Sequence, residues 1–187
     1  ELIPEKIKGK GINYFLSDEG FLYGVDKKGF VKVSQSDTYK NAMNFGGNYF
    51  TVVTDAEKGL IDVYVVTGDA QVVKAETPEL RLKDIVSFGG NYFMTNRGIV
   101  FTVATDGRVL IKDDVRVGVI AKKGGNFFTD TSNFFYSVAE NGDLQMPGIP
   151  LTMKVSTILK LGSNYFIDQT GKFFVVDKAG KVYERPM

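Results

Sequence analysis

The chain has 187 residues, of which 43% are hydrophobic and 24% charged, and these values predict one compact domain over residues 1–187. Its 23 basic and 22 acidic side chains give a net charge of +1, which excludes the basic footprint of a nucleic-acid-binding protein. The chain has no cysteine and no histidine, so disulfides, thiolate nucleophiles, histidine bases and nearly every zinc or copper site are excluded. No apolar run approaches the ~18 residues of a membrane helix, and we expect no membrane insertion.

The first residue is Glu1, and neither a basic segment nor an apolar leader follows it. Two interpretations stay open, a trimmed chain and the removal of a signal peptide. The compartment is therefore not assigned, although a secreted or periplasmic location is slightly favoured.

A short motif, Gly-x-Asn-aromatic-Phe, occurs five times in the chain. Its first glycines are separated by 35, 43, 35 and 38 residues, and each is followed by a second glycine in a predicted turn, 18, 22, 18, 18 and 18 residues later. Such regular offsets indicate an internal repeat. The motifs begin at Gly11, Gly46, Gly89, Gly124 and Gly162, and the second glycines are Gly29, Gly68, Gly107, Gly142 and Gly180.

Each repeat predicts four β-strands. In the third repeat they cover residues 84–88, 91–95, 99–103 and 108–111, with Gly and Asp/Asn-Gly turns between them. The first glycine of each motif is expected at positive φ in a two-residue type II′ turn. The repeats cover approximately residues 1–35, 36–76, 77–113, 114–147 and 148–187.

Five four-stranded units predict an all-β fold, a five-bladed β-propeller. The central strands are apolar on both faces, as a sheet packed between two neighbours requires. A closed barrel and a β-solenoid remain the alternatives. Every repeat supplies its own four strands, so no exchange of a terminal strand is expected, although residues 1–4 are a candidate addition to the last blade's outer edge.

Length variation among the repeats falls in two kinds of loop, those between second and third strands and those joining successive units. An insertion occurs in the loop at residues 54–59, and others occur in the connections at 75–83 and 147–153. In an up-and-down meander these loops share one edge, which we name the variable-loop face. Because repeat proteins often concentrate insertions on a binding face, this face is the predicted binding surface.

The candidate binding residues are the polar side chains of these loops, each of which could equally be an ordinary solvated group. They are Asp18, Glu19, Tyr39, Asp55, Glu57, Lys58, Asn96, Arg97, Asp113, Asp114, Arg116, Thr131, Ser132, Gln169 and Thr170.

The five motif asparagines suggest a ligand site in each repeat, but a structural role is the preferred interpretation. An asparagine beside a tight turn can bond to nearby backbone and fix the hairpin. These residues are Asn13, Asn48, Asn91, Asn126 and Asn164.

No catalytic, metal or cofactor motif is present. Nucleotide-binding loops and EF-hand spacing are absent, and Asp113 and Asp114 form an isolated acidic pair. Because two acids suffice for glycoside hydrolysis, a small hydrolase is still an alternative, but units this short leave few residues for a catalytic cleft. We therefore expect no enzymatic activity, no cofactor and no metal.

Two segments, Gly20-Phe-Leu-Tyr-Gly-Val25 with Gly29-Phe-Val-Lys-Val33 and Gly171-Lys-Phe-Phe-Val-Val176 with Gly180-Lys-Val-Tyr183, resemble the blades of tachylectin-type lectins. The resemblance covers about half of each repeat. It implies a five-bladed propeller that binds N-acetylated amino sugars between neighbouring blades. This chain departs from that family in having no tryptophan, and no lectin residue is transferred to it.

The resulting hypothesis is a non-enzymatic binding or scaffold module, expected to be monomeric, that recognises a protein partner through the variable-loop face. Its loops differ chemically from repeat to repeat, which favours one asymmetric partner over several equal sites. A glycan-binding lectin-like propeller is the first alternative, and a hydrolase using carboxylates of the central channel is the second.

Overall fold

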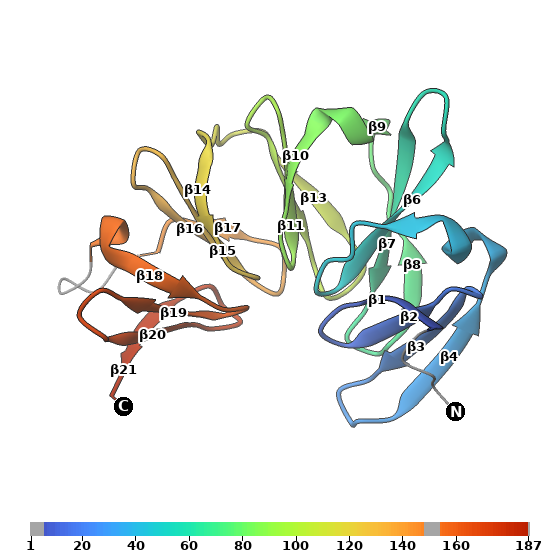
Figure 1. Cartoon of the computed structure of the whole chain (residues 1–187), viewed down its shortest axis with the longest axis horizontal. Helices are drawn as coiled ribbons and strands as arrows, with labels where there is room; N and C mark the ends of the chain where they lie inside the picture. Colours follow the sequence, from blue (N-terminus) through green and yellow to red (C-terminus); the bar gives the residue numbers. More distant parts are fainter. Residues whose placement is uncertain (1–5, 148–153, 187) are drawn as a thin grey trace.

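A computed structural model describes residues 6–147 and 154–186, and its strands form five antiparallel sheets. Each sheet takes four consecutive strands from one repeat, in the order in which they occur along the chain (Figure 1). The predicted all-β fold with five four-stranded blades of a β-propeller is confirmed. No described strand is exchanged between the first and last blades.

The blades are numbered along the chain. Blade 1 contains β1 (Ile7–Lys10), β2 (Tyr14–Ser17), β3 (Phe21–Val25) and β4 (Val31–Gln35). Blade 2 contains β5 (Ala42–Met43), β6 (Tyr49–Asp55), β7 (Leu60–Val66) and β8 (Val72–Lys74), and β9 (Leu80–Arg81) also pairs with β7. Blade 3 contains β10 (Ile85–Phe88), β11 (Tyr92–Thr95), β12 (Val100–Val103) and β13 (Val109–Lys112).

The last two blades follow the same plan. Blade 4 contains β14 (Ile120–Lys123), β15 (Phe127–Asp130), β16 (Phe135–Val138) and β17 (Leu144–Gln145). Blade 5 contains β18 (Ile158–Leu161), β19 (Tyr165–Asp168), β20 (Phe173–Val176) and β21 (Val182–Arg185). Short 3-10 helices at Asp37–Asn41, Leu82–Asp84 and Val155–Thr157 precede three of the blades.

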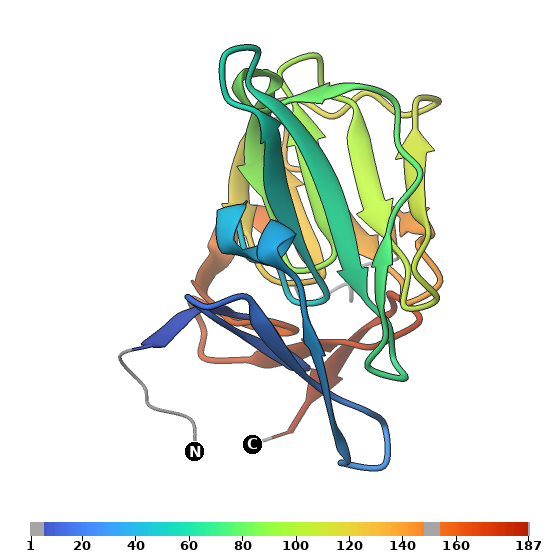
Figure 2. The ribbon, with the colours of Figure 1, turned by 90° about the vertical axis from the view of Figure 1, so that its right-hand side faces the viewer.

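The blades lie along an arc, with blade 1 at one end and blade 5 at the other (Figures 1 and 2). The five Gly-x-Asn turns point toward the centre of the arc, which we call the hub, and the loops between second and third strands lie along its outer rim (Figure 1). Successive blades are joined by backbone hydrogen bonds at the hub, but the described residues of blades 1 and 5 share none. The arc is therefore open between its two ends.

Aromatic side chains fill the space between successive blades. In blades 2 to 5 the second aromatic of the motif stacks on a ring of its own sheet, as Phe93 does on Phe101 at 4.9 Å between ring centroids. It also meets the first aromatic of the preceding blade, and the Tyr49–Phe93 centroids lie 5.8 Å apart. Both rings of this pair are fully buried, so the alternating aromatic motif builds the inter-blade core.

The motif glycines do not adopt the predicted type II′ turn, because none of them has positive φ. Their small size is needed for a different reason. A Cβ atom on Gly89 would collide with the ring of Tyr92, and one on Gly46 would collide with the ring of Tyr49. The aromatic side chain three residues later folds back over the glycine and leaves no room for a side chain.

Positive φ occurs instead at the other two turns of each repeat. In the turn between third and fourth strands the residues are Gly29, Ala70, Gly107, Gly142 and Gly180, and in the rim loops they are Gly20, Gly59, Gly98, Asn133 and Gly171. Blade 2 thus uses Ala70 and not the predicted Gly68, and its offset of 24 residues from Gly46 reflects the longer hairpin formed by β6 and β7.

Two sequence-based expectations fall on residues that the structure does not describe. The candidate edge addition at residues 1–4 lies outside the described part of the chain, as does the insertion at 147–153 beyond residue 147. In the described part, no helix is long and apolar enough to cross a membrane.

Candidate functional site

The rim loops and the connections between blades share one edge, as the meander predicts. The amide of Ser36 donates to the carbonyl of Gly20 at 3.1 Å, and the amide of Val117 donates to that of Gly98 at 3.1 Å. In each case a rim loop is bonded to the connection that leaves its own blade. The variable-loop face is therefore the rim of the arc.

One polar side chain at the end of the second strand anchors the rim loop in four blades. Ser17 accepts from the amide of Phe21, Thr95 from that of Ile99, Asp130 from that of Phe134 and Asp168 from that of Lys172, always four residues later. These hydrogen bonds lie within the chain, so the backbone of the rim loops is fixed without a ligand.

Asp168 accepts three hydrogen bonds at a single carboxylate oxygen. Its Oδ1 accepts from the amide of Thr170 at 2.9 Å, from the hydroxyl of Thr170 at 2.7 Å and from the amide of Lys172 at 3.0 Å. The hydroxyl bond from Thr170, together with the amide bonds, lowers the pKa of the Asp168 carboxyl. Thr170, a predicted binding residue, is thus a partner of this anchor.

Most predicted binding residues lie in separate loops spread along the rim, where the arrangement of the blades keeps them apart (Figure 1). Several form local contacts: Glu19 pairs with Lys6 at 3.3 Å, Asp55 accepts from the Lys58 amide at 3.0 Å, and Arg116 donates to the Asp113 carbonyl at 2.6 Å. The remainder, Asp18, Glu57, Asp114, Thr131, Ser132 and Gln169, are exposed or partly exposed loop residues.

Tyr39 differs from the other predicted binding residues because it belongs to the core. It is only 8% exposed and packs edge-on against Phe50 at 5.5 Å and against Tyr64 at 5.7 Å between ring centroids. The 3-10 helix Asp37–Asn41 turns this ring inward. Tyr39 therefore covers blade 2 and is not available to a partner.

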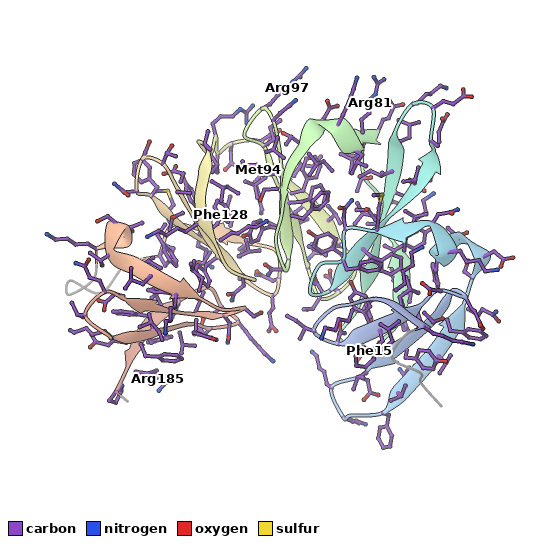
Figure 3. The ribbon with its side chains drawn as sticks, in the orientation of Figure 1. Phe15, Arg81, Met94, Arg97, Phe128 and Arg185 are labelled. Atoms are coloured by element: carbon purple, nitrogen blue, oxygen red, sulfur yellow. The ribbon has the colours of Figure 1, made fainter. Side chains whose placement is uncertain are left out.

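Asn96 and Arg97 line a cavity of about 650 Å³ between blades 3 and 4, which we call the rim cavity. One wall is formed by β10 and β11, and the other by β14 and by the connection between blades 3 and 4. Figure 3 shows Met94 between the two blades and Arg97 at the outer tip of its loop. The lining residues are Val86, Ser87, Met94, Thr95, Asn96, Arg97, Gly98, Val117, Gly118, Val119, Ile120, Ala121 and Lys123.

The rim cavity is mainly aliphatic, with positive charge and no acid. Val86 is 57% exposed and Val119 is 69% exposed, so apolar side chains face solvent on both walls. Arg97 and Lys123 supply the charge, and Lys123 Nζ donates to the carbonyl of Phe88 at 3.1 Å. The cavity can thus accommodate an aliphatic group and attract a carboxylate near Arg97.

Sequence reasoning found the polar tip of this cavity and missed its apolar walls. The segment Val117-Gly-Val-Ile120 is an apolar connection, and its exposure follows only from its place beside Val86. The one sequence signal for these apolar walls is that an apolar connection lies on the variable-loop face.

Four of the five motif asparagines join neighbouring blades at the hub, which confirms a structural role for them but not the predicted partner. Asn13 Nδ2 donates to the carbonyl of Thr67 at 3.0 Å and Asn91 Nδ2 to that of Val138 at 3.2 Å, each in the next blade. Asn48 and Asn126 make the corresponding bonds to Val103 and Val176. Each of these four side chains therefore fixes the adjacent blade and not its own hairpin.

A second cavity, of about 620 Å³, lies at the hub and is lined by residues of all five blades. Asp26 and Glu140 are its acidic residues, and Lys27 and Lys178 also line it. Asp26 Oδ1 accepts from the amides of Lys28 and Phe30, both at 2.9 Å, and so holds its own turn. Among the described residues, no group of three or more acidic side chains lies close enough to hold a metal ion.

No family model matches this sequence, and no curated protein matches it. Several solved structures are similar to it, and three of them are described here. A streptogramin B lyase has 15% identity and a TM-score of 0.38, covering 99% of this chain and 71% of its own. A selenomethionine-substituted virginiamycin B lyase from Staphylococcus aureus has 13% identity and a TM-score of 0.32, covering 93% of this chain and 66% of its own.

The third structure is a catalytically inactive virginiamycin B lyase from Staphylococcus aureus with Quinupristin. It has 16% identity and a TM-score of 0.31, covering 92% of this chain and 65% of its own. The chain thus spans about two thirds of the length of both virginiamycin B lyases. All three proteins are lyases and none is a tachylectin-type lectin, and at these identities their activity does not transfer to this chain.

Proposed function

We propose that the chain is a non-enzymatic binding module that recognises a protein partner at the rim cavity. The partner segment is an extended or looped peptide with an aliphatic side chain and a nearby carboxylate. The aliphatic group enters between Val86 and Val119, and the carboxylate pairs with Arg97.

The observation that supports this proposal is the exposed apolar surface of the rim cavity. Val86 and Val119 belong to different blades, and both expose more than half of their surface beside a cavity of about 650 Å³. Apolar walls with a charged rim are typical of surfaces that bind protein segments. The lining holds hydroxyls but no acid, histidine or cysteine that could activate them, which favours binding over catalysis.

The direct test is binding of a fluorescently labelled peptide pool in which every member pairs an aliphatic with an acidic residue. A pool with lysine in place of the acidic residue serves as the comparison. We expect the wild-type chain to retain the acidic pool and Val119→Asp to lose it, because the new carboxylate removes an apolar wall and repels the ligand.

Matched variants distinguish binding at the rim cavity from binding elsewhere on the surface. Arg97→Glu should weaken retention of the acidic pool, whereas Arg116→Glu reverses an equal charge outside the cavity and should not. Ile111→Asp changes another exposed aliphatic residue of blade 3 and should bind like the wild type. Equal retention of both pools, or equal loss in the control variants, would contradict recognition at the rim cavity.

A glycan ligand is the second candidate. It is favoured by one observation, since the rim cavity lies between neighbouring blades, where the resemblance to tachylectin-type lectins implies a sugar site. A glycan-array screen followed by titration calorimetry distinguishes the two candidates. Saturable binding of one N-acetylated sugar that Val119→Asp abolishes would replace the protein-partner proposal.

The hydrolase alternative depends on the two acids of the hub, Asp26 and Glu140. The bonds that Asp26 accepts from its own turn favour a structural role for that carboxylate. Glycosidase activity that is lost in both Asp26→Asn and Glu140→Gln would support this alternative.

A further inference from the structure

The cavity at the hub differs from the rim cavity because charges of both signs converge on it. It measures about 620 Å³, lies at the centre of the arc (Figure 1), and has Asp26, Lys27, Glu140 and Lys178 among its lining residues. None of these four side chains forms a salt bridge with a described residue. Unpaired charges of opposite sign at a concave site favour a ligand that carries both.

Two of the four charged residues are engaged within their own part of the hub. Asp26 Oδ1 accepts from two amides of its own turn, both at 2.9 Å. The Lys27 side chain lies across Gly68 of blade 2, where an added Cβ atom would be 2.7 Å from Lys27 Cε. Glu140 and Lys178 are exposed, and neither side chain bonds to a described residue. These two residues are therefore the charges available to a ligand.

Glu140 and Lys178 occupy adjacent positions on a fixed part of the backbone. The amide of Glu140, in the turn between β16 and β17, donates to the carbonyl of Lys178, in the turn between β20 and β21, at 2.8 Å. The amides of Gly68 and Thr105 make the same bond to the following blade, at 3.0 and 2.9 Å. Both charged residues also line a cavity of about 600 Å³ between the turns of blades 4 and 5. A carboxylate and an ammonium group thus extend from neighbouring turns beside both cavities.

The hub cavity also has an apolar part close to this pair. Val138 and Val176, two residues before Glu140 and Lys178, line it together with Val25 and Ile12. The side chain of Ile12 is accessible to a ligand, since this residue is 76% exposed. An aliphatic group can therefore lie inside the hub while a polar head group contacts the charged pair.

A second observation concerns the hydrogen-bond acceptors of the hub wall. The amide oxygens of Asn13, Asn48, Asn91 and Asn126 are buried without a hydrogen-bond partner, and all four residues line the cavity. Buried acceptors without a partner are uncommon in folded proteins. Their uncompensated dipoles make this wall electronegative, which favours a ligand with a positive group.

We propose that the hub cavity binds a free α-amino acid with an aliphatic side chain. The α-ammonium group pairs with the Glu140 carboxylate, and the α-carboxylate pairs with the Lys178 ammonium group. Neighbouring opposite charges match this ligand because its two charged groups are attached to the same carbon atom. The aliphatic side chain lies against Ile12 and Val25. This site is separate from the rim cavity and does not depend on the partner proposed there.

Titration calorimetry with L-leucine, at up to about 10 mM ligand, tests the proposal on the purified chain. Saturable binding of one equivalent is expected. Leucine amide lacks the carboxylate and isocaproic acid lacks the ammonium group, so each should bind about tenfold more weakly or worse. Glycine keeps both charges without the aliphatic group and should also bind more weakly. Absence of saturable L-leucine binding, or equal binding of leucine amide, would overturn the proposal.

Charge-neutral variants identify the residues that hold the two charged groups. Glu140→Gln and Lys178→Gln should each raise the dissociation constant for L-leucine about tenfold or more. Glu57→Gln and Lys160→Gln are the matched controls, because each removes an exposed charge of the same sign outside the hub cavity. Both controls should bind L-leucine like the wild type. Equal weakening in controls and hub variants would contradict recognition by Glu140 and Lys178.

Methyl NMR of the wild type locates the site without relying on a variant that could fold poorly. L-leucine should shift the methyl signals of Val25 and Val176 at the hub and leave those of Val86 and Val119 at the rim cavity unchanged. An acidic peptide bound at the rim cavity should do the reverse, so failure of one proposal is distinguishable from failure of the other. Leucine-induced shifts confined to the rim valines would overturn binding at the hub.

Discussion

The hydroxyl of Tyr49 donates to the main-chain oxygen of Tyr92, at 2.9 Å, and Tyr92 occupies the same position in the following blade. The same hydroxyl donates to the carbonyl of Gly89 at 3.0 Å. Burial raises the pKa of Tyr49, so this donor is neutral and protonated at physiological pH. Hydrogen bonds from the Tyr49 hydroxyl to the motif of the following repeat thus hold the two blades together.

Removal of the Tyr49 hydroxyl should destabilise the fold, and a hydroxyl added at the equivalent position of blade 4 should stabilise it. Tyr49→Phe is expected to lower the free energy of unfolding by about 1–2 kcal/mol, because two buried carbonyls lose a donor. Blade 4 has Phe127 at this position, and Phe127→Tyr should stabilise the chain by about 0.5–1 kcal/mol. Urea unfolding of both variants measures the effects, and a stabilised Tyr49→Phe would contradict the argument.

Glycines of the two turn types should respond differently to alanine. Gly171 has φ +85°, and a methyl group added there would have no described atom within 4 Å, so Gly171→Ala should cost only backbone strain, about 1–2 kcal/mol. Gly89 lies under the Tyr92 ring, and Gly89→Ala should cost about 3 kcal/mol or more through overpacking. Thermal unfolding distinguishes them, and equal losses of stability would refute the assignment of a packing role to Gly89.

The hub asparagines offer a comparison within one chain. Asn91→Ala removes a bond to Val138 in the next blade and should cost about 1 kcal/mol. Asn164→Ala changes the same motif position in blade 5, where the amide has no described partner, and should stay within about 0.5 kcal/mol of the wild type at low protein concentration. If Asn164→Ala were the more damaging change in dilute solution, the inter-blade role of these residues would be wrong.

Asp168 should make the stability depend on pH in the acidic range. Its pKa is lower in the folded chain than in the unfolded one, so its contribution is present above about pH 4 and is lost as the pH falls through the folded-state value. Asp168→Asn should therefore lower the urea midpoint at neutral pH, and its difference from the wild type should narrow in acid. Asp113→Asn is the control, and a difference for Asp168→Asn that is constant with pH would count against this role.

The repeats, the strands and the five blades could be predicted because their signals are local and recur. Short apolar runs define the central strands, and Gly and Asp/Asn-Gly turns divide them, so one motif interpreted correctly gives five sheets. The reason for the motif glycine could not be predicted in this way. A glycine at positive φ and a glycine beneath an aromatic ring look alike in sequence, and only the position of the Tyr92 ring distinguishes them.

The candidate site was predictable only in part, because its walls belong to different repeats. Polar loop residues such as Arg97 are visible in sequence, but Val86 and Val119 become neighbours of one cavity only when blades 3 and 4 pack. The inward turn of Tyr39 likewise depends on the 3-10 helix ahead of blade 2. Which loops share a surface is a property of the arc, and no single repeat encodes it.

The hub hydrogen bonds run in one direction, from Ile12 to Gly47, then to Gly90, Gly125 and Ser163. Each blade brings one donor for its successor and one acceptor for its predecessor, so every junction is built from the same parts. Duplication or loss of a whole repeat would leave the remaining junctions chemically unchanged. A chain with one repeat more or fewer would therefore form each hub junction from the same backbone donors and acceptors.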